Sequence, residues 1–157
     1  MAARSVDRRR RSDGREGGQG LVEFSLALIP FLFILMGVVD LGRGIYTNNG
    51  VAQAAREIAR VASVHQCAFP CTSATWSTEI VDVVNTQKRL VPGLQTSDIT
   101  ITCVEITDAP YTVASGGQCP DGKFIRVEAR TSFSLVTPLL PVPNPFTVSS
   151  TTHVQVP

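Results

Sequence analysis

The sequence has few of the residues from which enzyme sites are built. Its 157 residues include only two histidines, His65 and His153, and four cysteines. It contains no glycine-rich phosphate loop, no nucleophile-elbow pattern and no His-Glu-x-x-His metal pair. A chain of this length has room for one modest core, which excludes a large enzyme. We therefore expect a protein that is not an enzyme and that needs no cofactor.

Basic residues are scarce outside the first 18 positions. Six of the 14 basic residues and three of the 13 acidic ones lie there, which leaves 8 basic and 10 acidic residues in the remainder. A basic tail before a slightly acidic remainder argues against a nucleic-acid partner. The tail has almost no large apolar residue, so we expect residues 1–18 to be disordered.

Long apolar runs are also absent, with one exception. Residues 21–39 read LVEFSLALIPFLFILMGVV, in which Glu23 is the only charge. The uncharged part, Phe24 to Val39, falls short of the ~20 residues that span a bilayer, but its flanks extend it. We assign Leu21 to Ile45 to one transmembrane segment. A buried core helix is the alternative, yet the remaining chain is too small to bury a helix that is apolar all round.

The arginines before this run set its orientation, because positive charge close to a span stays in the cytoplasm. The N-terminus is then cytoplasmic, and the chain after about residue 45 is extracytoplasmic. A cleaved secretory signal fits less well, since small-residue matches after the run are weak or too far downstream. We expect a single-pass protein of the cytoplasmic membrane with an extracytoplasmic C-terminal domain.

Past the membrane the apolar pattern becomes amphipathic, so residues 19–66 are expected to form one long helix. Its apolar face comprises Val51, Ala54, Ala55, Ile58 and Ala62. Its polar face comprises Gln53, Arg56, Arg60 and Ser63. Pro30, or the run Asn48, Asn49 and Gly50, can bend or break this helix. A second helix is expected from Trp76 to Leu90, with Ile80, Val83, Val84 and Leu90 on one face.

The apolar period then changes to two, which predicts strands. It does so in residues 99–104, 124–136 and 146–156, and turn-rich segments separate these three runs. The fold class is therefore α+β: a three-stranded, mainly antiparallel sheet packed on the amphipathic part of the long helix. Residues 67–157 would form the extracytoplasmic α+β domain.

All four cysteines follow the apolar run, at Cys67, Cys71, Cys103 and Cys119. An even number in a small extracytoplasmic domain favours disulfides. Proximity in sequence favours Cys67 with Cys71 and Cys103 with Cys119, although four cysteines allow three pairings. A zinc site that includes His65 is the alternative, but its spacing departs from the usual Cys-x2-Cys pair, so no metal is expected.

The residues at the entrance of the span resemble the processing site of type IV prepilins. Residues 17–24 read GGQGLVEF. In prepilins a membrane peptidase cuts after a glycine, and the fifth residue of the mature chain is a glutamate followed by an aromatic residue. The resemblance implies cleavage between Gly18 and Gln19, which makes residues 1–18 a leader and puts Glu23 and Phe24 at those two positions.

Residues 18–63 resemble more specifically the TadE-like family of pilin-related proteins, which work with tight-adherence (Flp-type) pilus systems. Its marks here are the GQ-x-x-VEF start, D-x-GR at 40–43 and AARE-x-AR at 54–60. The resemblance implies a pilin-like fold and a minor pilin or pseudopilin that supports pilus assembly. Its partners would be a prepilin peptidase, other pilin-like subunits, pilus-assembly membrane proteins and the lipid bilayer. A signal-anchored binding domain that never enters a pilus is the alternative.

Three charged residues in the predicted span are candidate sites: Glu23, and the pair Asp40 and Arg43. A carboxylate at the edge of the hydrocarbon is costly unless paired, so Glu23 is expected to face a partner. After cleavage the new amine of Gln19 lies one turn away and can pair with Glu23 of the same or a neighbouring chain. A wetted side chain in the first helical turn is the alternative. Asp40 and Arg43, three residues apart, predict an ion pair that anchors the helix near the outer interface.

Overall fold

The computed structural model describes residues 13–136 and 145–157. Its helices are α1 (Asp13–Val64), α2 (Thr78–Leu90) and the short 3₁₀ helix η1 (Thr96–Asp98). Its strands are β1 (Ile99–Val104), β2 (Phe124–Phe133) and β3 (Phe146–Gln155). The strands form one antiparallel sheet in the order β1-β2-β3. The expected α+β fold, with a long N-terminal helix, a short second helix and three strands, is confirmed.

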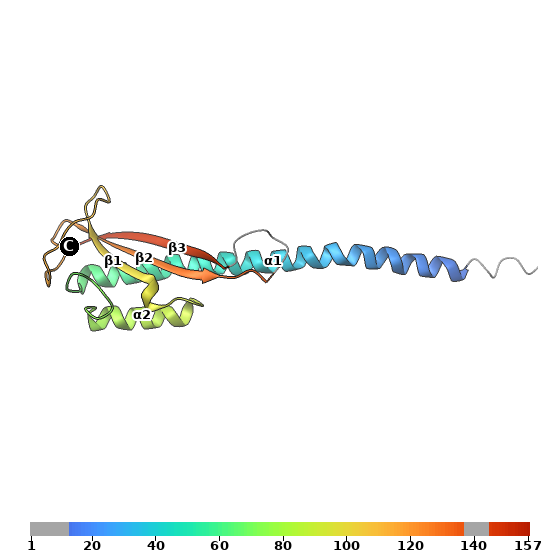
Figure 1. Cartoon of the computed structure of the whole chain (residues 1–157), viewed down its shortest axis with the longest axis horizontal. Helices are drawn as coiled ribbons and strands as arrows, with labels where there is room; N and C mark the ends of the chain where they lie inside the picture. Colours follow the sequence, from blue (N-terminus) through green and yellow to red (C-terminus); the bar gives the residue numbers. More distant parts are fainter. Residues whose placement is uncertain (1–12, 137–144) are drawn as a thin grey trace, which may run out of the picture.

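The two halves of α1 have different surroundings (Figure 1). Its N-terminal half projects from the molecule as a bare helix, and the sheet and α2 lie along its C-terminal half. The C-terminal half contacts β2, β3 and α2. The N-terminal half of α1 is therefore uncovered, and its C-terminal half is part of the folded domain.

α1 runs without interruption through both positions that were expected to disturb it. Pro30 lies inside the helix, and Asn48, Asn49 and Gly50 are all helical. Gly50 serves packing instead: a Cβ atom there would come within 3.2 Å of Cγ2 of Val91. The glycine therefore lets the segment after α2 approach α1 closely.

The start of α1 also differs from expectation. The helix begins at Asp13, so the end of the segment expected to be disordered is helical, while residues 1–12 lie outside the described residues. Extending an existing helix costs far less than nucleating one, and the apolar run supplies the nucleus.

The core lies between α1, α2 and the sheet. On α1 the fully buried residues are Val51, Ala54, Ala55, Ile58, Ala59 and Ala62, which include the whole expected apolar face. Alternate residues of β1 and β2 face them, as the period of two predicts. Ser63, expected on the polar face, is buried instead, because it lies one turn after the buried Ala59. Its hydroxyl needs no water there, since it donates a 2.9 Å hydrogen bond to the carbonyl of Arg60.

Ser77 determines where α2 begins. Its hydroxyl oxygen accepts a hydrogen bond from the backbone N–H of Ile80 and donates one of 3.0 Å to the carbonyl of His65 at the end of α1. This cap starts α2 at Thr78, two residues later than expected. In the first turn, a hydrogen bond from its own backbone N–H lowers the pKa of Glu79.

The buried face of α2 consists of Ile80, Val84 and Gln87. Leu90, expected on that face, is instead 55% exposed. At 100° per residue, Leu90 is turned about a quarter of a circle away from the direction that Ile80, Val84 and Gln87 share. Helix geometry therefore buries the polar Gln87 and leaves the apolar Leu90 exposed.

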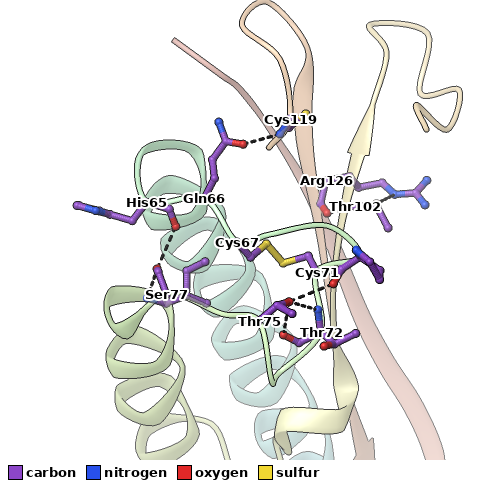
Figure 2. Close-up of a disulfide and its surroundings, with 12 residues drawn as sticks. His65, Gln66, Cys67, Cys71, Thr72, Thr75, Ser77, Thr102, Cys119 and Arg126 are labelled. Atoms are coloured by element: carbon purple, nitrogen blue, oxygen red, sulfur yellow. Dashed lines mark hydrogen bonds between the residues drawn. A yellow bond between two sulfur atoms is a disulfide. The ribbon is translucent and has the colours of Figure 1, made fainter. Parts of the chain in front are cut away.

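Disulfides join Cys67 to Cys71 and Cys103 to Cys119, with Cα atoms 5.5 and 5.7 Å apart. This is the pairing that proximity in sequence favoured, and it uses all four cysteines, so none remains for the zinc alternative. The backbone N–H of Cys119 also donates a 2.7 Å hydrogen bond to Oε1 of Gln66 (Figure 2). The two cross-linked loops therefore meet at the C-terminal end of α1.

The two disulfides should contribute unequally to stability. The Cys103–Cys119 bond joins residues 16 positions apart, and the Cys67–Cys71 bond joins residues 4 positions apart. Loop-closure entropy in the unfolded chain predicts losses of about 3 and about 2 kcal/mol, respectively, when each pair is changed to alanine. Urea unfolding followed by the fluorescence of Trp76, the one tryptophan, measures both losses. A larger loss for the Cys67–Cys71 pair would contradict this order.

Candidate functional site in the membrane helix and at its junction with the domain

The N-terminal half of α1 is the first part of the candidate site. The helix is long and apolar enough to cross a membrane. In its most apolar stretch of 18 residues, no residue is buried within the protein. Large apolar side chains are exposed along it from Leu21 to Tyr46. A continuous apolar surface of this extent marks a site of membrane or protein contact. α1 is thus a candidate membrane anchor, and it contains the predicted span Leu21 to Ile45.

Glu23 and Phe24 are both exposed on this bare part of the helix. Nε2 of Gln19 donates a 3.2 Å hydrogen bond to Oε1 of Glu23, one helical turn away. The carboxylate therefore already reaches residue 19 in the uncleaved chain. Cleavage before Gln19 would put an amine within one turn of the same carboxylate.

Asp40 is the second charged position of the apolar helix, and it is only 4% exposed. Nη1 of Arg43 lies 3.2 Å from its Oδ1, so the two residues form an ion pair. Both carboxylate oxygens also accept hydrogen bonds of 3.2 Å from the backbone N–H of Val136. These partners offset the cost of burying a charge.

The bond to Val136 could not be derived from the sequence. The spacing of Asp40 and Arg43 predicts their ion pair, but Val136 lies 96 positions away and donates from its backbone. A backbone N–H carries no side-chain signature. The nearest signal in the sequence is Asp40 itself, an acidic residue at the end of the apolar run, whose carboxylate needs hydrogen-bond donors.

Aromatic side chains complete the junction between α1 and the domain. The guanidinium carbon of Arg43 lies 5.4 Å from the ring centroid of Phe133, and the rings of Phe133 and Phe146 meet edge to face at 5.1 Å. The Tyr46 hydroxyl donates to the carbonyl of Leu90 at 3.4 Å. The end of β2 and the start of β3 are thereby held against α1.

An apolar groove of about 650 Å³ opens at this junction. Six of its lining residues belong to α1, and four belong to the sheet side: Gly37, Asp40, Leu41, Gly44, Ile45 and Asn48, and Phe133, Leu135, Phe146 and Val148. Polar atoms form only a small part of its wall. Asp40 is the one charged residue of this lining, and its carboxylate is paired with Arg43 and with the backbone N–H of Val136, so the groove suits an apolar ligand.

Residues 18–60 match the model of the family described as TadE-like protein. The match covers 43 of the 157 residues, so α2 and the sheet lie outside it. It includes Gly18, Glu23, Asp40 and Arg43. No curated protein and no solved structure matches the chain. The match confirms, for this segment, the resemblance to the TadE-like family drawn from the sequence.

Proposed function

We propose that the protein is a TadE-like minor pilin or pseudopilin that supports assembly of a tight-adherence (Flp-type) pilus. A prepilin peptidase would remove residues 1–18, residues 19–66 would anchor the chain, and residues 67–157 would form the outer domain. The observation that carries this proposal is the TadE-like match, which begins at Gly18 and lies on one unbroken helix whose first half is apolar.

The mechanism of such a subunit is packing. The bare half of α1 offers a continuous apolar surface to the helices of neighbouring subunits. Within the hydrocarbon an unpaired charge is costly, so the amine of Gln19 and the carboxylate of Glu23 would pair within or between subunits. That pairing would fix how far neighbouring helices are shifted along one another.

Two independent features support an extracytoplasmic domain. The six arginines before the span favour a cytoplasmic N-terminus. The two disulfides, which use all four cysteines, suit an oxidising compartment. The proposed location is the cytoplasmic membrane, with the domain outside and entry into the pilus as the final step.

The proposal is tested by the mass of the mature protein. The full chain is expressed with and without an active prepilin peptidase, and its N-terminus is determined by mass spectrometry. We expect an N-terminus at Gln19 only when the peptidase is active. A chain that stays uncut despite an active peptidase would overturn the processing step and favour a signal-anchored binding domain.

Gly18 and Gly20 provide a matched pair of variants for this experiment. A Cβ atom at either position meets no atom within 4 Å, so neither substitution disturbs the fold. Gly18→Leu places a bulky side chain beside the proposed scissile bond and should abolish cleavage. Gly20→Leu adds the same bulk two residues away and should be processed.

A further inference from the structure

The chain that follows β2 returns to α1 at the apolar helix. Val136, three residues past the end of β2, lines a small apolar hollow with Leu32, Leu35, Met36 and Val39. Its backbone N–H is bonded to Asp40, which fixes its position, yet its side chain is 66% exposed. An apolar side chain is thus held at the surface beside the membrane helix.

The depth of this contact follows from helix geometry. With a rise of 1.5 Å per residue, a hydrocarbon core of about 30 Å that begins at Leu21 ends about 20 residues later, near Leu41. Residues 32–39 then lie roughly 3 to 14 Å inside that boundary. Val136 therefore lies at the depth of acyl chains and not at the depth of water.

The polarity of the neighbouring surface changes at the same boundary. Arg43, two residues above it, is half exposed and stacks on Phe133, as expected for a cation at the headgroup level. The groove crosses this boundary, because its α1 lining runs from Gly37 below it to Asn48 above it, and the sheet side contributes Leu135 and Phe146. The described sequence on either side of the β2–β3 connection, residues 131–136 and 145–152, contains no charged residue.

We propose that this end of the domain is a lipid-binding surface: acyl chains of the leaflet on the domain's side occupy the groove and cover Leu135, Val136 and Phe146. Lipid is favoured as the occupant because the groove is continuous with the exposed apolar surface of α1, which the bilayer surrounds. The domain is then in contact with the membrane in addition to being tethered to it. This inference rests on the membrane anchor of the proposed function and not on the pilus role.

Depth-sensitive fluorescence on the full chain in lipid vesicles tests the proposal. All native cysteines are in disulfides, so Val136→Cys introduces the one free thiol, which is labelled with an environment-sensitive dye. We expect blue-shifted emission, strong quenching by doxyl-labelled phosphatidylcholine, and at least threefold weaker quenching by aqueous iodide than for Ile106→Cys. Ile106 is the matched control, an apolar residue that is 84% exposed in the turn after β1.

Two outcomes would overturn the proposal. Iodide quenching at Val136→Cys equal to that at Ile106→Cys would place this surface in water. In the second outcome the label is shielded from iodide but is not quenched by doxyl lipid, and the shielding increases with the ratio of protein to lipid. That result would show that a second copy of the protein covers the surface. Leu135→Cys repeats the measurement at a neighbouring position in case the label at position 136 disturbs the fold.

A label on the anchor separates failure of this inference from failure of the anchor itself. Ile29→Cys lies on the exposed apolar part of α1 and should be quenched by doxyl lipid whenever α1 is inserted. Quenching at position 29 but not at 136 refutes the lipid-binding surface alone. No peptidase or pilus protein is present in the vesicles, so the result does not depend on the pilus role.

Discussion

Replacing Glu23 with alanine should leave cleavage after Gly18 intact and reduce pilus assembly by up to about a hundredfold. The variant would leave the amine of Gln19 without a carboxylate at the edge of the hydrocarbon, where the cost of an unpaired charge is at most the value of about 2.5 to 3.5 kcal/mol found at the centre of a membrane helix. That cost corresponds to roughly a hundredfold in an equilibrium constant. The measurement is the number of pili per cell by electron microscopy, with N-terminal mass spectrometry on the same cells.

Two variants sharpen this test. Glu23→Gln keeps the size of the side chain and removes only its charge, so it should be nearly as defective as alanine. Ser25→Ala changes the next polar side chain, whose hydroxyl is already bonded to the carbonyl of Leu21 in the same helix at 2.8 Å, and it should assemble normally. Normal assembly of Glu23→Gln would show that the amine has no need of that charge.

The second large effect is expected at Ile58, where α1 enters the core of the domain. Its side chain is fully buried among the sheet and helix residues of the core. Truncation to alanine removes three carbons and leaves a cavity, so Ile58→Ala should lower the free energy of unfolding by about 2 to 5 kcal/mol. Domains of this size have about 5 to 15 kcal/mol in total, so the loss is severe.

Urea unfolding in detergent micelles, followed by Trp76 fluorescence, measures this effect, because Trp76 packs against the core and not on the bare helix. Ile58→Val should lose about 0.5 to 1.5 kcal/mol, as a graded intermediate. Ile106→Ala removes the same atoms from an exposed site and should change stability by less than about 0.5 kcal/mol. Equal effects at positions 58 and 106 would disprove the placement of Ile58 in the core.

The elements of the fold were predictable because each has a local cause. The apolar faces of α1 and the alternation in β1 and β2 are periodic in sequence, and the period distinguishes helix from strand. The error on the face of α2 occurred because a distant partner decides it. Gln87 is buried and Leu90 is exposed because the packing of the α2 axis on α1 selects the face, which the side chains alone do not reveal.

The candidate site divides in the same way. The ion pair of Asp40 with Arg43 follows from a spacing of three on a helix, and the structure contains it. The bond from Val136 to Asp40 and the ring of Phe133 beneath Arg43 depend on how the sheet docks, and no local pattern encodes that docking. The proposed roles of Gly18, Gln19, Glu23 and Phe24 concern a peptidase and other subunits, so they remain predictions.

The continuity of α1 has a mechanical consequence. An unbroken helix of 52 residues is about 78 Å long, and a rotation or a translation of one end also moves the other end. A shift of its N-terminal half by one residue against a neighbouring helix would turn the domain at the other end by about 100° and move it by about 1.5 Å along the helix axis. The packing of the N-terminal half of α1 inside the membrane would then decide in which direction the sheet faces outside the membrane.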